Sequence, residues 1–119
     1  MSSPAKLLLI EDDASAASAL HRVLADEGYD VSMAARGDDA LGQAEQGSFD
    51  AVITDLKLPG LDGMELVRRL HATKPRLPII LMTAHGTTDT AIEATKRGAY
   101  DYLLKPFEME DLIELVARA

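Results

Sequence analysis

The sequence predicts an α/β domain in which five parallel strands alternate with five helices in a doubly wound sheet. Two observations support this fold class: strand-length apolar runs alternate with helix-length amphipathic stretches, and one helix-to-strand turn recurs three times. The chain of 119 residues has the size of one compact domain, and we treat residues 1–119 as a single domain. Its 47% hydrophobic and only 4% aromatic residues predict an aliphatic core.

The predicted strands are apolar runs without clean polar alternation, which is typical of strands buried on both faces of a sheet. They lie at Leu7–Ile10, Val31–Ala34, Ala51–Ile53, Ile79–Met82 and Tyr102–Leu104, and the second of these is the weakest. Apolar residues at helical spacing predict the helices between them. These stripes are Ala17, Leu20 and Leu24; Met64, Val67 and Leu70; Leu112, Leu115 and Val116; and a weaker set of Ala91, Ile92 and Thr95.

The recurring turn connects a helix to the strand that follows it. It is found at Gly28-Tyr29-Asp30, Gly47-Ser48-Phe49-Asp50 and Gly98-Ala99-Tyr100-Asp101. Glycine can adopt the left-handed conformation that ends a helix, and the aspartate then opens the strand. Three copies of one turn indicate a repeated βα unit, and such units build a parallel sheet.

Composition excludes several classes of function. A formal net charge of −8 disfavours direct nucleic-acid binding, which needs a basic surface, and favours cationic partners such as metal ions. The absence of cysteine excludes disulfides, zinc thiolates and thiol catalysis, and it fits a reducing cytoplasm. The apolar run Leu7–Ile10 is too short for a signal peptide or a membrane span. We therefore expect a cytoplasmic protein that does not contact membranes.

Polar residues gather where the predicted strands end. Ligands of open parallel sheets bind outside the carboxyl ends of the strands. The residues at these ends are Glu11, Asp12 and Asp13 after the first strand, Asp55 at the end of the third, Thr83 at the end of the fourth and Lys105 after the fifth.

This set of side chains predicts a phosphoryl site. Clustered carboxylates repel one another unless a cation joins them, and Mg²⁺, with Mn²⁺ as a substitute, prefers oxygen ligands. A metal ion and the ammonium of Lys105 would neutralise a transferring phosphoryl group. An aspartate can itself be the nucleophile and form an acyl phosphate, and the hydroxyl of Thr83 could donate to its oxygens. Asp55 is the predicted phosphoacceptor.

Four segments resemble the receiver domains of bacterial two-component response regulators. They are Ile10–Asp13, Thr54–Gly63, Thr83–Ala84 and Asp101–Phe107, and the resemblance covers essentially the whole chain. It implies a flavodoxin-like (βα)5 fold with strand order 2-1-3-4-5. It also implies a signalling switch, not a metabolic enzyme, which takes its phosphoryl group from a histidine kinase and catalyses its own phosphorylation and dephosphorylation with Mg²⁺.

The resemblance assigns a role to each residue of the metal site. Asp55 would be phosphorylated and would also bind Mg²⁺. Asp12 and the backbone carbonyl of Lys57 would be direct ligands, and Glu11 would bind mostly through water.

The resemblance also assigns the residues that would contact the phosphoryl group and change position when it is present. Lys105, Thr83 and Ala84 would contact the phosphoryl group, and Thr83 and Tyr102 would move together as the switch. The Lys105–Pro106 bond would be cis, which only X–Pro bonds reach at low cost. The face formed by the fourth helix, fifth strand and fifth helix would then mediate dimerisation or effector docking.

The segments Met82–Gly86 and Lys105–Glu108 are most similar to receivers of NtrC-type transcriptional activators, which carry an ATPase and a DNA-binding domain after the receiver. We expect a transcriptional regulator whose effector domain is absent from this chain, and a homodimer on phosphorylation. Mixed charges at Glu93, Lys96, Arg97, Asp111 and Arg118 could pair across a two-fold axis.

Other readings remain for the chain and for two of its aspartates. A phosphatase of the haloacid dehalogenase type also uses an aspartate after a strand, but it places a second aspartate where this chain has Lys57. A nucleotide-binding module would need a P-loop or a Gly-rich dinucleotide turn, and neither is present. Asp13 is interpreted as a helix N-cap, and Asp62 with Glu65 as a variant capping box.

Overall fold

The computed structural model describes residues 4–56, 58–83, 93, 95–96, 98–104 and 107–119. Its elements are β1 Lys6–Ile10, α1 Ala14–Asp26, β2 Asp30–Ala34, α2 Gly37–Gln46, β3 Ala51–Asp55, α3 Gly63–Thr73, β4 Ile79–Thr83, β5 Asp101–Leu104 and α5 Met109–Arg118. The strands form one parallel sheet in the order β2-β1-β3-β4-β5. The predicted fold class and strand order are confirmed, while the predicted helix at Ala91–Thr95 falls largely outside the described residues.

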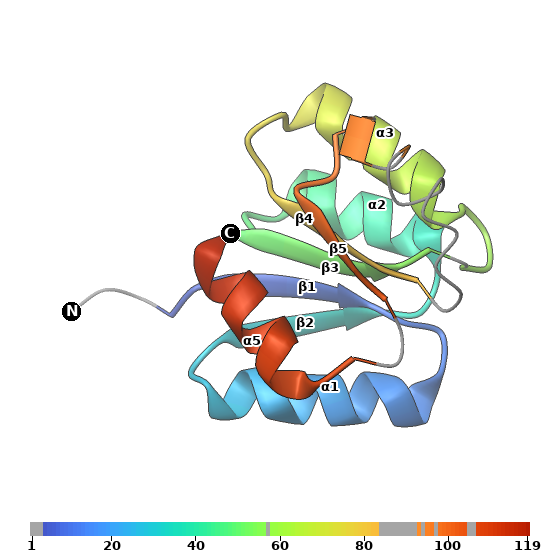
Figure 1. The fold of residues 1–119 in the computed structure, drawn as a ribbon. Coiled ribbons are helices and arrows are strands. Elements are labelled where there is room, and N and C mark those ends of the chain that lie inside the picture. The colour runs from blue at the N-terminus through green and yellow to red at the C-terminus, as the bar shows by residue number, and fades with distance from the viewer. Residues whose placement is uncertain (1–3, 57, 84–92, 94, 97, 105–106) are drawn as a thin grey trace.

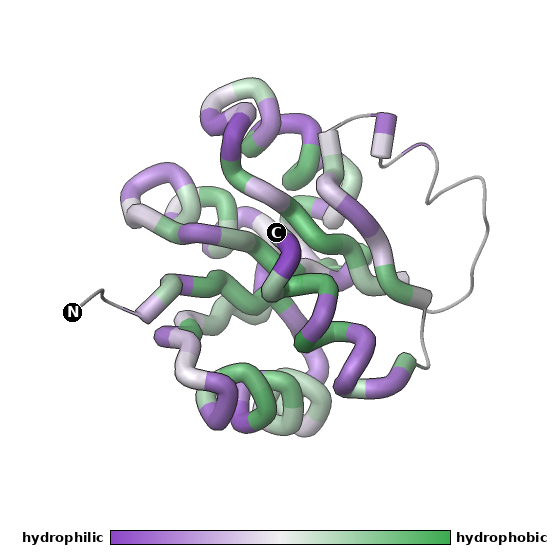
Figure 2. Tube along the Cα trace, turned by 60° about the vertical axis from the view of Figure 1, so that its left-hand side comes forward, coloured by the Kyte–Doolittle hydropathy of each residue, from purple (hydrophilic) through white to green (hydrophobic). Residues whose placement is uncertain are grey.

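Helices cover both faces of the sheet: α1 and α5 pack on one face, and α2 and α3 on the other (Figure 1). Along β1 the side chains alternate between two buried clusters, with Leu7 and Leu9 facing α1 and α5, and Leu8 and Ile10 facing α2 and α3. The central strands form the hydrophobic middle of the molecule (Figure 2). The predicted stripes of α1, α3 and α5 contribute to these clusters, apart from Ala17, which is buried but belongs to neither. The sheet thus divides the core into two layers.

Strand β2 differs from the central strands because it lies, like β5, at an edge of the sheet. Its central residues are only partly buried, and Met33 is 47% exposed. β1 and β4, by contrast, have four and five consecutive buried residues. An edge strand has no neighbour on one side, which explains why its apolar run was the weakest in the sequence.

The helix-to-strand turns follow the prediction at two positions of three. Gly28 and Gly98 have φ of 95° and 118°, in the left-handed region. The prediction was wrong for Gly47, whose φ is −94°. There a Cβ would lie 2.8 Å from a ring carbon of Phe49, so the glycine makes room for the aromatic ring of the turn.

Two aspartates begin helices, as predicted. Asp13 accepts hydrogen bonds from the backbone N–H groups of Ser15 and Ala16 at 3.0 and 3.4 Å, and Asp62 accepts one from Glu65 at 2.9 Å. These bonds satisfy donors that the first turn of a helix leaves without partners.

The side chain of Glu65 is directed along its own helix. Its carboxylate accepts hydrogen bonds from Arg68 and Arg69, and these two guanidinium groups lower the pKa of Glu65 to about 2. In a full capping box the side chain of Glu65 would accept a hydrogen bond from the backbone N–H of Asp62. Here that side chain forms ion pairs three and four residues along the helix. Because both arginines are exposed and Glu65 is only partly buried, these pairs add little to stability.

Two substitutions of Asp13 distinguish the contribution of its N-cap hydrogen bonds from that of its negative charge. Asp13→Asn keeps an oxygen acceptor, whereas Asp13→Ala removes both the acceptor and the charge. We expect Asp13→Ala to be less stable than Asp13→Asn by about 1 kcal/mol in urea unfolding. Equal unfolding midpoints and slopes for the two variants would show that the hydrogen bonds of the cap contribute nothing.

Candidate functional site

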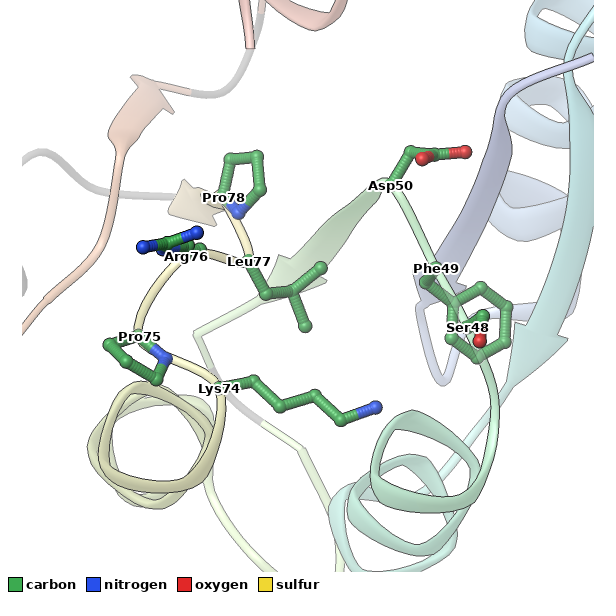
Figure 3. Close-up of a pocket in the computed structure, with 8 residues that line it drawn as sticks. All are labelled: Ser48, Phe49, Asp50, Lys74, Pro75, Arg76, Leu77 and Pro78. Atoms are coloured by element: carbon green, nitrogen blue, oxygen red, sulfur yellow. The ribbon is translucent and has the colours of Figure 1, made fainter.

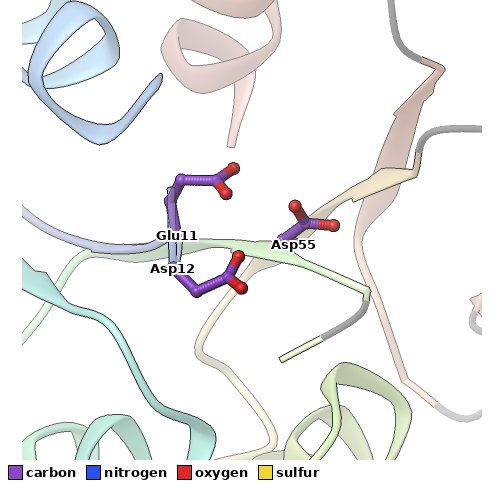
Figure 4. Close-up of side chains that lie close together, drawn as sticks. All are labelled: Glu11, Asp12 and Asp55. Atoms are coloured by element: carbon purple, nitrogen blue, oxygen red, sulfur yellow. The ribbon is translucent and has the colours of Figure 1, made fainter. Parts of the chain in front are cut away.

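The register between β1 and β3 brings the first acidic residues to Asp55. Ile10 pairs with Thr54 in this parallel register, so the next residues along each strand, Glu11 and Asp55, leave the sheet side by side. Glu11 is also held from β2, because its backbone N–H donates to the carbonyl of Ala34 at 3.1 Å. Figure 4 shows the carboxylates of Glu11, Asp12 and Asp55 gathered at this sheet edge.

The three carboxylates are spaced as a cation site would require. Each of Glu11, Asp12 and Asp55 offers an oxygen, and these oxygens all lie within 4.8 Å of one another. Such a set suits a hard divalent cation, which could bind one or two of them directly and the rest through water. Negative charges this close stabilise a bound cation and repel each other without one.

The three acidic residues differ in burial and in backbone contacts. Glu11 is 4% exposed, and its Oε1 accepts a hydrogen bond from the backbone N–H of Asp13 at 3.2 Å. Asp12 is exposed and Asp55 is partly buried. The side chain of Asp13 caps α1 and is not one of the three clustered carboxylates, which confirms its structural interpretation. The site thus combines a fixed inner carboxylate with an accessible outer one.

Thr83 lies on the other side of Asp55. Asp55 pairs with Met82 in the register between β3 and β4, and Thr83 is the next residue and 6% exposed. Leu81 pairs with Tyr102 on β5, and side chains alternate along a strand, so Thr83 and Tyr102 are diagonal neighbours on one sheet face. Tyr102 is partly buried against the cluster under α2 and α3.

Four predicted site residues lie outside the described residues: Lys57, Ala84, Lys105 and Pro106. The structure thus brings together Glu11, Asp12 and Asp55 and places Thr83 on the adjacent strand. The roles predicted for the other four stay predictions.

A hollow at the opposite end of the sheet has a different character. It has a volume of about 600 Å³ and is lined by Ser48, Phe49, Asp50, Lys74, Pro75, Arg76, Leu77 and Pro78 (Figure 3). Lys74 points across it and donates to the carbonyls of Ala44 and Gly47 at 2.6 and 2.8 Å. A cation at these terminal carbonyls stabilises the end of α2, which makes Lys74 a structural residue.

The chain belongs to the response regulator receiver domain family. The family model for the response regulator receiver domain matches residues 7–117, which includes every strand end described above. Receiver domains are the signalling domains of two-component systems, and the sequence resemblance to them is thereby confirmed.

Curated relatives are transcriptional and other response regulators of greater length. The response regulator protein FleR of Pseudomonas aeruginosa is 42% identical over 114 residues, which span 96% of this chain and 24% of FleR. The DNA-binding transcriptional regulator NtrC of Salmonella typhimurium is 36% identical over 111 residues, or 93% of this chain and 24% of NtrC. The chain therefore spans about a quarter of the length of these relatives.

Solved structures share the whole fold. A CheY-like receiver domain protein from Methanospirillum hungatei has a TM-score of 0.92 at 28% identity, covering 98% of this chain and 93% of that one. NtrX from Brucella abortus has a TM-score of 0.90 at 33% identity, covering 98% of this chain and 26% of that one. Within the part of this chain that the structure describes, no helix has the length and apolar character to cross a bilayer.

The acidic cluster predicts an unusual response to a neutralising substitution. Asp12→Asn removes one of three close negative charges, and we expect it to raise the free energy of unfolding in metal-free buffer by about 1 kcal/mol. Addition of Mg²⁺ should then stabilise the wild type more than the variant. Thermal unfolding with EDTA and with excess Mg²⁺ measures both effects.

Asp30→Asn is the matched control, because Asp30 is an exposed aspartate at the opposite end of the sheet. It removes the same charge from a chain of net charge −8 without touching the cluster. If Asp30→Asn raises the free energy of unfolding as much as Asp12→Asn does, the effect comes from the overall charge. The proposed repulsion within the acidic cluster would then be wrong.

Proposed function

We propose that this chain is a phosphorylation switch that accepts a phosphoryl group on Asp55 from a histidine kinase. The observation that carries this proposal is the placement of Asp55 at the end of β3, with the carboxylates of Glu11 and Asp12 within 4.8 Å. Membership of the receiver family supports the reaction class.

The transfer is a displacement at phosphorus. A carboxylate oxygen of Asp55 forms the new O–P bond while the bond from phosphorus to the imidazole nitrogen of the donor breaks, and an acyl phosphate results. Mg²⁺, held by Asp12, Asp55 and the backbone carbonyl of Lys57 with Glu11 through water, would neutralise charge on the phosphoryl oxygens. Lys105 would add a second positive charge. Hydrolysis of the acyl phosphate by water resets Asp55.

The readout we propose uses Thr83 and Tyr102. The hydroxyl of Thr83, together with the backbone N–H of Ala84, would donate to the phosphoryl group and draw Thr83 toward Asp55. Tyr102, the diagonal neighbour of Thr83 on the same face, would then turn into the space that is released. A pair of side chains with two arrangements is the kind of element that a phosphoryl group can bias.

The relatives support a wider role in transcription. FleR is named a response regulator and NtrC a DNA-binding transcriptional regulator. We propose that this chain is the cytoplasmic receiver part of such a regulator, and that DNA contact is made by another domain. The net charge of −8 supports this division, because it disfavours direct binding of nucleic acid.

Substitution of Asp55 tests the proposal. Purified protein incubated with Mg²⁺ and acetyl phosphate should gain the mass of one phosphoryl group, and peptide mapping should locate it on Asp55. Asp55→Asn should abolish the gain because an amide is not a nucleophile of this kind, and EDTA should suppress it in the wild type.

Asp62→Asn provides the control, since asparagine is as good an N-cap as aspartate and the fold is kept. This variant should be phosphorylated like the wild type. A mass gain that survives in Asp55→Asn, or no gain in the wild type, contradicts the proposal.

Dimerisation is the second expected consequence of phosphorylation. Exposed charges at Asp111 and Arg118 lie on α5, those at Glu93 and Lys96 precede β5 in the chain, and the exposed Tyr100 donates a hydrogen bond to the carbonyl of Arg118 at 3.2 Å. Light scattering should show a larger species with beryllofluoride and Mg²⁺ than without. Asp111→Arg should weaken it by charge repulsion. An unchanged mass in the wild type would refute dimerisation.

A further inference from the structure

The loop that follows Asp55 is held by the first turn of α2, which is distant from it in sequence. We call residues 58–62 the β3–α3 loop. The backbone N–H of Gly37 donates to the carbonyl of Pro59 at 3.0 Å. A Cβ on Gly37 would overlap the backbone carbonyl of Leu61. Backbone therefore meets backbone at this point, and only glycine allows the approach.

A second contact holds the middle of the loop. Gly60 has φ of 81°, and a Cβ there would lie 2.5 Å from Oδ1 of Asp38 and 2.9 Å from Nη2 of Arg36. Those two side chains form a double hydrogen bond, Nε to Oδ1 at 3.1 Å and Nη2 to Oδ2 at 3.3 Å. The ion pair thus lies across Gly60 and covers the turn of the loop.

A third contact closes the loop where α3 begins. The backbone N–H of Gly63 donates to the carbonyl of Leu56 at 2.8 Å. A Cβ on Gly63 would lie 2.5 Å from the carbonyl oxygen of Asp55 and 2.7 Å from that of Leu56. The loop is therefore held at two places: its end at Gly63 packs against the backbone of Asp55, and its middle packs against the start of α2. A displacement of its α2 end would be passed to the backbone that adjoins the acidic cluster.

We propose that Arg36, Gly37 and Asp38 are positioning residues for phosphoryl transfer at Asp55. They are not members of the acidic cluster, and they act by fixing the β3–α3 loop. This inference rests on the proposed function of Asp55. It adds a role for the start of α2, an element that contributes no side chain to the acidic cluster.

Gly37 is the sensitive position because its neighbour cannot move aside. A flexible side chain could rotate away from a new methyl group, but the carbonyl of Leu61 belongs to the loop backbone. Gly37→Ala must therefore shift the loop relative to α2. A misplacement of about 1 Å near a reacting group can slow a reaction on the order of a hundredfold.

The chain offers a matched control in the same helix. Gly42 is also in α2, and a Cβ there meets nothing within 4 Å. Gly42→Ala and Gly37→Ala make the same chemical change. They differ only in whether the added methyl group meets the β3–α3 loop.

The experiment compares the wild type, Gly37→Ala and Gly42→Ala in two readouts. Phosphorylation by acetyl phosphate with Mg²⁺ should be slowed by roughly ten- to a hundredfold in Gly37→Ala, and unchanged in Gly42→Ala. The Mg²⁺ dissociation constant, followed by NMR at the Asp55 and Leu56 amides, should rise in Gly37→Ala alone. A purely structural role for Gly37 would leave Mg²⁺ affinity of the folded protein unchanged.

Asp38→Ala keeps Gly37 and breaks the ion pair, so it provides a second test if Gly37→Ala does not fold. Its loop amides at Leu58 and Leu61 should exchange hydrogen faster than in the wild type, and phosphorylation should slow several-fold. The inference is overturned if Asp38→Ala, or a folded Gly37→Ala, matches Gly42→Ala in rate and in Mg²⁺ affinity while the wild type is phosphorylated. A wild type that takes up no phosphoryl group overturns the proposed function as well as this inference.

Discussion

The hydrogen-bonded register between β1 and β3 is the constraint on which the rest of the structure depends. It pairs Leu7 with Ala51 and Ile10 with Thr54, and so sets Glu11 beside Asp55. A slip of one residue would send the side chains of a strand to the opposite faces of the sheet. Leu8 and Leu9 are both fully buried, in different clusters, so such a slip would misplace the core and separate the carboxylates at once.

Most of the site could be predicted because its residues are marked by their neighbours in the sequence. The acidic residues, Thr83 and Lys105 end or follow apolar runs, and parallel strands end at a common edge whatever their order. The N-caps of α1 and α3 were predictable for the same reason, since the bonds of Asp13 and Asp62 span three residues or fewer. The order of the strands needed the resemblance to receivers, because alternation alone leaves several orders open.

Part of what the sequence did not reveal depends on contacts between distant segments. The ammonium of Lys74 reaches the end of α2, 27 and 30 residues away, and Gly37 donates to Pro59. Neither pair has a local pattern that marks it. Gly47 was misjudged because its turn is shaped by the ring of Phe49, and Glu65 because two arginines compete for its carboxylate. These two contacts are local along the chain, but the pattern of residue types does not fix which of several neighbouring groups each residue contacts.

The division of the core by the sheet has an evolutionary consequence. The cluster under α1 and α5 and the cluster under α2 and α3 share no residue. No side chain belongs to both clusters, so a substitution in one layer acts on the other only through the backbone of the shared strands, and selection can act on the side chains of each layer. Each layer is free to diverge toward new protein partners only away from the acidic cluster, because the start of α1 is bonded to Glu11 and the loop beside Asp55 is held by the start of α2.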